Sequence, residues 1–171
     1  MNKILVVNVN WLGDVILSTP IFRALKERFP QARLSCLAVP RVEDILTSCP
    51  YVDEVIIYDE KGRDRGLPGK WRLVLRLKRE NFDAVFLLHR SWTRALLVYL
   101  AGIPQRIGYN LKNRGVFLTR KIDPPAGIIH RADYYGGVIE GYGVPLRNRH
   151  SEVVADPKIS AQVEEILRAE G

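Results

Sequence analysis

The run Ile4-Leu5-Val6-Val7-Asn8-Val9 constrains the fold more than any other feature, because it is apolar on both of its faces. A strand with one solvent-exposed face alternates apolar and polar residues. A strand buried on both faces is continuously apolar, as in the middle of a parallel sheet. A turn follows, and apolar residues then recur every three or four positions as far as Phe29, which predicts a helix. Pro20 lies inside this stretch, where it is either tolerated in the first turns or kinks the helix.

Apolar β-branched runs and amphipathic stretches keep alternating along the chain. Strands are expected over 33–39, 52–58, 84–88, 106–109 and 116–119, and helices over 41–48, 70–80, 94–101, 131–142 and 158–170. This alternation predicts an α/β protein with a Rossmann-like, doubly wound, mostly parallel sheet. We expect one domain over residues 1–157, with 158–171 forming a helix that leads toward a further domain.

The charge balance favours anionic partners. The chain has 26 Lys and Arg against 19 Asp and Glu, a formal net charge of +7.

No apolar run approaches the roughly 20 residues that cross a bilayer. Cys36 and Cys49 lack the spacing of a metal or disulfide framework. We therefore expect a cytoplasmic protein with no metal and no cofactor.

Asp14 is the first candidate functional residue. In doubly wound folds ligands collect at the carboxyl ends of the strands. A dinucleotide site would need several glycines there, but the turn offers only Gly13, and the carboxylate after it repels phosphate from the helix N-terminus. The helix dipole keeps such a carboxylate ionised, so Asp14 can act as a general base. The position also suits a helix cap, and both interpretations stay open at this point.

A basic segment runs from Lys61 to Arg79, with eight cations against the single acid Asp64. The cations toward its C-terminal end recur at helical spacing, which is typical of a solvated helix face. Those of the preceding loop can close on an anion, because Arg presents a fork that matches phosphate and carboxylate. The candidate anion-binding residues are Lys61, Arg63, Arg65 and Lys70.

The stretch from His89 to Arg94 ends one predicted strand and opens a helix. Ser91 can cap this helix while backbone N–H groups hold a ligand oxygen. His89, Ser91 and Trp92 are therefore candidate ligand contacts, although a purely structural capping turn explains the same residues. His89 and Ser91 are not expected to form a nucleophile pair, because no G-x-S-x-G motif surrounds them.

Three stretches together resemble one family. The residues Gly13 to Lys26 (GDVILSTPIFRALK) resemble the N-terminal signature of glycosyltransferase family 9, the ADP-heptose:lipopolysaccharide heptosyltransferases. Residues 91–109 (SWTRALLVYLAGIPQRIGY) resemble a second segment of that family, and 130–135 (HRADYY) a third. The resemblance is somewhat closer to the type II enzymes.

The resemblance implies the N-terminal, acceptor-binding half of a two-domain GT-B enzyme that inverts the anomeric centre without a metal. Asp14 maps onto the family's base, which would take a proton from a heptose or Kdo hydroxyl of the lipopolysaccharide inner core. Gly13, the basic loop and the stretch from His89 to Trp92 would contact substrate. The donor ADP-heptose would be bound mainly by a second domain, so this chain alone is expected to be inactive. Peripheral contact with the anionic inner face of the inner membrane is expected, and nucleic-acid binding is not.

A different class of function is also compatible with the charge. A basic α/β module could bind nucleic acid or an anionic surface without catalysing a reaction. Such a module would need aromatic side chains interleaved with the cations on one exposed platform. Within the basic segment Trp71 is the aromatic residue available for it.

Overall fold

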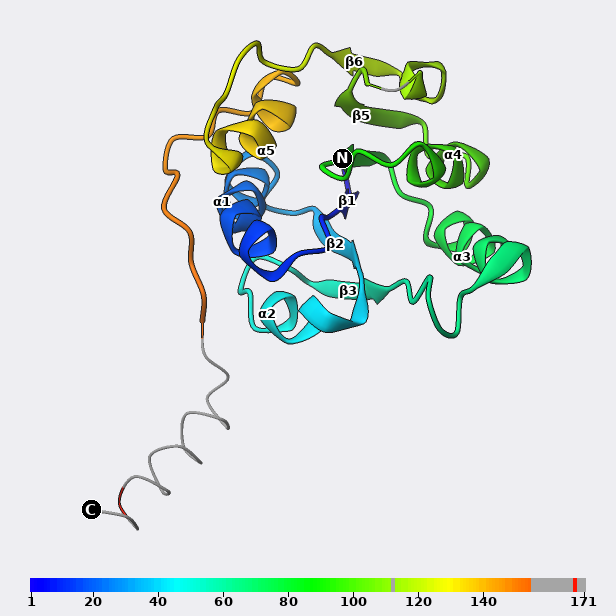
Figure 1. Ribbon diagram of the computed structural model, residues 1–171. Coiled ribbons are helices and arrows are strands. Elements are labelled where there is room, and N and C mark those ends of the chain that lie inside the picture. Colours follow the sequence, from blue (N-terminus) through cyan, green and yellow to red (C-terminus); the bar gives the residue numbers. More distant parts are fainter. Residues whose placement is uncertain (112, 155–167, 169–171) are drawn as a thin grey trace.

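A computed structural model describes residues 1–111, 113–154 and 168 of the chain. Within these residues six strands pair in parallel, in the order β3-β2-β1-β4-β5-β6, which confirms the predicted Rossmann-like sheet (Figure 1). The strands are β1 (Lys3–Val7), β2 (Arg33–Ala38), β3 (Glu54–Ile57), β4 (Ala84–Leu87), β5 (Gln105–Tyr109) and β6 (Arg120–Ile122).

Helices cover both faces of the sheet, α1, α2 and α5 on one side and α3 and α4 on the other (Figure 1). The helices are α1 (Leu12–Arg28), α2 (Glu43–Thr47), α3 (Gly66–Glu80), α4 (Trp92–Leu100) and α5 (Arg131–Glu140), with short 3-10 turns η1 (Pro40–Val42) and η2 (Arg114–Phe117). Strand β1 shows why its sequence is apolar throughout: Ile4 and Val6 pack in the core under α1 and α5, whereas Leu5 and Val7 pack under α3 and α4.

Helix α1 runs through Pro20 without interruption. A proline has no N–H for the carbonyl one turn earlier, here that of Ile16. The Thr19 hydroxyl donates to this carbonyl at 2.8 Å, and the Ser18 hydroxyl donates to the Val15 carbonyl at 2.7 Å. The Thr19 hydroxyl therefore replaces the backbone hydrogen bond that Pro20 cannot make to the Ile16 carbonyl, and the Ser18 hydroxyl adds a second bond in the same turn.

Several predicted boundaries shift. The helices expected from 70 and from 94 begin earlier, at Gly66 and Trp92, so Lys70 lies in the second turn of a helix and not at its start. The segment expected as one helix over 41–48 is a 3-10 turn followed by the short helix α2. The helix expected over 158–170 lies outside the described residues, apart from position 168.

The strand expected over 116–119 is wrong. Residues Arg114–Phe117 form the 3-10 turn η2, and the strand β6 follows at Arg120–Ile122. Asn113 adopts a left-handed conformation (φ 58°) at the start of the turn, and the buried Arg114 side chain bonds back to the Tyr109 carbonyl at 2.8 Å. These two features turn the chain before it rejoins the sheet.

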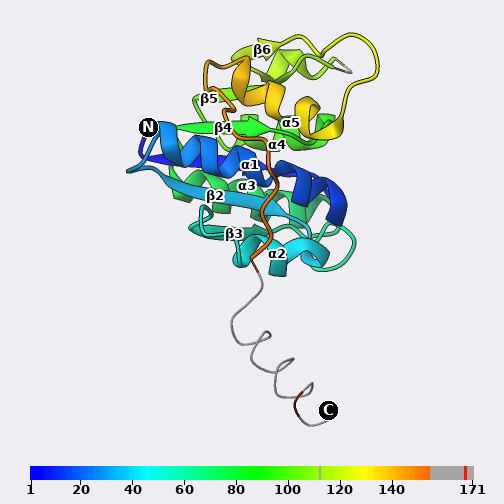
Figure 2. The same ribbon diagram turned by 90° about the vertical axis from the view of Figure 1, so that its left-hand side faces the viewer.

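The chain after α5 passes along the outside of α1 (Figure 2). Arg23 of α1 donates to the Asn148 carbonyl at 3.0 Å and pairs with the Glu152 carboxylate. The Glu152 N–H donates to the Thr19 hydroxyl at 2.9 Å. None of the described helices is long and apolar enough to span a bilayer.

We predict that Thr19→Val lowers the free energy of unfolding by about 1–3 kcal/mol, because it leaves the Ile16 carbonyl and the Glu152 N–H without their partner. Urea denaturation measures the change. Ser48→Ala is the control, since it removes an exposed hydroxyl that bonds the Asp44 carbonyl at 2.9 Å. Equal effects of the two substitutions would contradict the role given to Thr19.

Candidate active site at the ends of β1 and β4

A cleft of about 1010 Å³ opens at the carboxyl ends of β1 and β4. Strand β2 lies on one side of β1 and β4 on the other, so the chain leaves these two strands in opposite directions. Such a switch point is where open α/β sheets bind ligands. Three segments line the cleft: the turn from β1 into α1, the turn from β4 into α4, and the chain around the start of α5.

The fully buried Asn8 fixes the floor of the cleft. Its side-chain oxygen accepts a hydrogen bond from the Ser18 hydroxyl of α1 at 3.1 Å. Its backbone carbonyl accepts one from Arg94 of α4 at 3.1 Å. Since Arg94 is 2% exposed, the end of β1 is tied to helices on both faces of the sheet by groups that water does not reach.

Asp14 is the third residue of α1 and lines the cleft. The helix cap is Trp11, without a side-chain cap bond, so the interpretation of Asp14 as the cap is wrong. The Asp14 side chain is 10% exposed, and Nη1 of Arg131 lies 2.8 Å from each of its carboxylate oxygens. The carboxylate thus stands at the positive end of α1 and is covered by one guanidinium from α5.

His89 faces the same cleft as a neutral group. Burial, aided by the positive charges of Arg94, Arg114 and Arg90, lowers the pKa of His89 to about 3. Its Nδ1 accepts a hydrogen bond from the Ser91 N–H at 3.0 Å, so the proton resides on Nε2 and can be donated to a ligand.

Ser91 caps α4, as the sequence predicts. Its hydroxyl accepts from the Arg94 N–H at 3.4 Å. The contact between His89 and Ser91 uses the Ser91 backbone and not its hydroxyl. The pair therefore lacks the geometry of a serine nucleophile and its base, in line with the sequence.

Arg114 holds the turn at His89 through the backbone, a role that the sequence did not predict. Its side chain is fully buried, its Nε donates to the Tyr109 carbonyl at 2.8 Å, and its Nη1 bonds the His89 carbonyl. Burial lowers the pKa of the Arg114 guanidinium. This charge is one of the reasons why His89 stays neutral.

Three further residues of the cleft were also missed, namely Arg90, Arg131 and Tyr135. The guanidinium of Arg90 lies over the Tyr134 ring, 5.7 Å from its centroid. Burial, and then the charge of Asp14, raise the pKa of Tyr135. Arg131 could have been found, because it begins a helix that follows a strand of the parallel sheet, and such helices start at the same edge as the strand ends.

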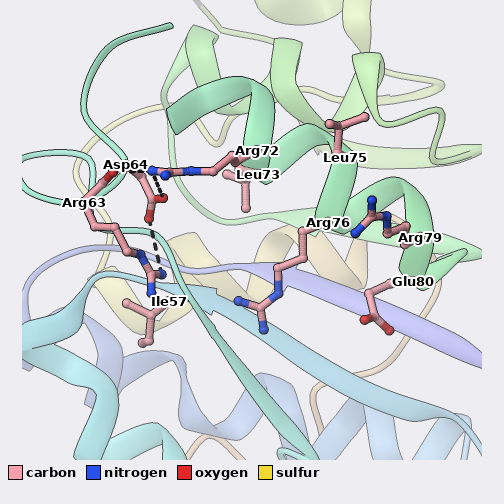
Figure 3. Close-up of a pocket in the computed structure, with 9 residues that line it drawn as sticks. All are labelled: Ile57, Arg63, Asp64, Arg72, Leu73, Leu75, Arg76, Arg79 and Glu80. Carbon is pink, nitrogen blue, oxygen red and sulfur yellow. Dashed lines mark hydrogen bonds and ion pairs between the residues drawn. The ribbon is translucent and has the colours of Figure 1, made fainter. Parts of the chain in front are cut away.

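The basic segment borders a separate groove of about 650 Å³ beside α3. In Figure 3, Arg63 and Arg72 converge on the buried Asp64, at 3.6 Å and 3.3 Å, while Arg76 and Arg79 follow along α3. Arg76 in turn pairs with Glu54 at 3.5 Å. Ion pairs thus offset part of the positive charge of the segment, and no aromatic side chain lines this groove among the described residues.

The structure brings together part of the predicted site. Gly13, Asp14, His89 and Ser91 line the cleft, whereas the other predicted contacts do not. Those outside its lining are Lys61, Arg63, Arg65, Lys70 and Trp92. The Trp92 ring packs edge-on against Phe117, with ring centroids 5.0 Å apart. The loop before α3 contacts α4, because Glu60 lies 3.8 Å from the buried Arg94.

Comparison with known proteins finds similarity to one family. The model of glycosyltransferase family 9 (heptosyltransferase) matches residues 70–146. Lipopolysaccharide heptosyltransferase 2 of Salmonella typhimurium is 32% identical over 107 residues, which are 63% of this chain and 31% of that protein. Over the matched residues the chain is similar to glycosyltransferase family 9. Lipooligosaccharide heptosyltransferase 2 of Haemophilus ducreyi is 25% identical and aligns with 97% of the chain and 47% of its own length.

Solved structures share the fold of this chain. A family 9 glycosyl transferase from Veillonella parvula superposes with a TM-score of 0.88 at 24% identity, over 99% of this chain and 50% of that one. ADP-heptose lps heptosyltransferase II of Escherichia coli gives 0.74 at 24% identity, over 96% and 50%. The chain therefore spans about half of these structures, and less than half the length of the two curated relatives.

The neutral state of His89 predicts a pH dependence of stability. Unfolding returns the pKa from about 3 toward its ordinary 6.5, so between these values the unfolded chain binds more protons. The free energy of unfolding therefore falls as the pH drops below 6.5, by at most about 1.4 kcal/mol per pH unit from this group.

His89→Asn keeps an acceptor for the Ser91 N–H and removes the titrating ring. Urea denaturation from pH 4 to 7 should show a shallower pH dependence for this variant than for the wild type. The control His150→Asn, at an exposed position, should keep the wild-type slope. Equal slopes for His89→Asn and the wild type would refute the buried neutral state.

Proposed function

We propose that this chain is the acceptor-binding domain of an inverting GT-B heptosyltransferase, which transfers heptose from ADP-heptose to the lipopolysaccharide inner core. The observation that carries this proposal is the Asp14 carboxylate at the floor of the switch-point cleft, 10% exposed and within reach of a ligand. Similarity to family 9 and the names of the relatives support the reaction class.

In the proposed reaction Asp14 accepts the proton of an acceptor hydroxyl. The freed oxygen attacks the anomeric carbon of the donor sugar, and the bond from that carbon to the ADP oxygen breaks on the opposite face. The heptose is then joined to the acceptor with inverted configuration, and ADP leaves with the bonding electron pair. Neutral His89 donates from Nε2 to an acceptor oxygen and holds that sugar beside the carboxylate.

The donor is assigned to a partner domain that faces this cleft. Gly13 and Asp14 lie in the first turn of α1, and the fixed negative charge disfavours a nucleotide phosphate at this helix end. The described part of the cleft is therefore assigned to the acceptor. A Cβ on Gly13 would have no atom within 4 Å, so the glycine leaves open space next to the proposed base.

Charge supports an anionic, membrane-linked acceptor. Lys61, Arg63 and Arg65 are exposed on the loop whose Glu60 pairs with Arg94 of α4, and Lys70 follows in α3. We propose that they bind phosphates of the acceptor and keep the enzyme at the anionic inner face of the inner membrane, on the cytoplasmic side. The alternative of a nucleic-acid module has less support: Trp71 of α3 is 58% exposed, but no aromatic residue lines the groove beside α3 in the described residues.

Asp14→Asn should lower the turnover of the enzyme that contains this chain with its donor-binding domain by about 10²–10⁴-fold, the usual contribution of a general base. The control is Asp133→Asn, which removes an exposed carboxylate paired with Arg149 at 2.9 Å. Release of ADP in the presence of ADP-heptose and acceptor measures the rate. Turnover of Asp14→Asn within a few-fold of the wild type would show that another group is the base.

The double variant Arg63→Gln with Arg65→Gln should weaken binding of the phosphorylated acceptor and flatten its dependence on salt, because exposed charges act over a screening length of about 10 Å at 0.1 M. The matched control removes Arg120 and Lys121, two exposed cations of β6. Titrations at low and high salt measure both effects. A double variant that binds like its control would remove the loop from the acceptor site.

A further inference from the structure

The proposed base is occupied by a side chain of the same chain. Both oxygens of Asp14 accept from Nη1 of Arg131 at 2.8 Å, so an acceptor hydroxyl meets a carboxylate that is already bound. The two partners differ in burial, because the Arg131 side chain is 65% exposed and that of Asp14 is 10% exposed. Arg131 can therefore swing into water, whereas Asp14 stays where it is.

The charges of the cleft indicate which kind of ligand could replace Asp14 as the partner of Arg131. Among the described residues that line it, Arg90, Arg131 and Asp14 carry charge, while His89 is neutral. The guanidinium of Arg90 is placed over the Tyr134 ring. The cleft thus has an excess of one positive charge, and the carboxylate that Arg131 now binds belongs to the protein itself.

We propose that Arg131 is a specificity-determining residue that binds an anionic group, a carboxylate or a phosphate, on the acceptor sugar. The ligand anion replaces Asp14 as the partner of the guanidinium, and the vacated carboxylate then accepts a hydrogen bond from the acceptor hydroxyl. No proton moves in this exchange. An acceptor without the anion leaves the pair of Asp14 and Arg131 closed, so the base is freed only for a sugar of the right charge. The inference rests on the proposed function.

The geometry suits this exchange because an arginine binds either anion through the same fork of N–H groups. A single nitrogen, Nη1, makes both bonds to Asp14. Because the Arg131 side chain is 65% exposed, water screens its charge, and a ligand anion can compete with Asp14 for it. Asp14 and the ligand anion then compete for one cation, and removing Asp14 should strengthen anion binding although it removes the base.

Calorimetric titration of the chain with four probes tests the proposal. The first pair is the methyl glycoside of Kdo and its methyl ester, which differ in the carboxylate. The second pair is methyl heptoside 4-phosphate and methyl heptoside, which differ in the phosphate. We expect the wild type to bind the charged member of at least one pair about tenfold more tightly, and the pair that shows this preference identifies the anion.

Arg131→Gln should reduce this preference to within about twofold, whereas the control Arg120→Gln should retain it. Asp14→Asn should bind the charged probe about tenfold more tightly than the wild type does, and adding Arg131→Gln should abolish this gain. A purely structural role for Arg131 would not produce a gain in Asp14→Asn, so this variant separates the two roles. Circular dichroism checks that each variant is folded.

Three results would overturn the inference: no charge preference in the wild type for either pair, weaker anion binding by Asp14→Asn, or loss of the preference in Arg90→Gln but not in Arg131→Gln. These outcomes are independent of the proposed function, which the turnover of Asp14→Asn tests. Anion selectivity through Arg131 with a catalytically competent Asp14→Asn enzyme would retain the binding role and reject the base.

Discussion

The parallel pairing of β1 with β4 is the constraint on which the site depends. It places the ends of the two strands side by side, with Val6 opposite Phe86 and Val7 opposite Leu87, and sends the chain from them in opposite directions. Backbone bonds from Leu88 and His89 to the Val7 carbonyl, at 3.1 and 3.2 Å, continue this pairing past the strands. As a result Asp14 and His89 line one cleft although they lie on separate turns.

Charges buried below the cleft give its two functional groups different properties. Arg94 and Arg114 are surrounded by protein, and they use backbone carbonyls as hydrogen-bond partners. Burial, aided by their positive charge, keeps the neighbouring His89 neutral, which makes it a hydrogen-bond donor with a defined tautomer. Asp14 lies instead in the first turn of α1, where both of its oxygens accept from the exposed guanidinium of Arg131. The same edge of the sheet thus presents a carboxylate and a hydrogen-bond donor to one cleft.

The sequence predicted the parts of the molecule that follow from periodicity. Strand β1 reads as buried on both faces, and the alternation of strands and helices leads to the parallel sheet. Because strand ends share an edge in such a sheet, the positions of Asp14 and His89 in one cleft could be anticipated. The partner of Asp14 could not, since Arg131 is 117 residues away and meets Asp14 only because α5 packs against α1. The same holds for Arg114, because an irregular segment has no period that tells an inward side chain from an outward one.

The most direct test is a structure of the enzyme containing this chain with the acceptor bound. The account predicts the reacting hydroxyl oxygen within about 2.6–3.2 Å of a carboxylate oxygen of Asp14, the distance that proton transfer requires. It also predicts that Arg131 has left Asp14 for an anionic group of the sugar. An acceptor whose reacting hydroxyl lies beside another ionisable side chain, with Arg131 still covering Asp14, would contradict it.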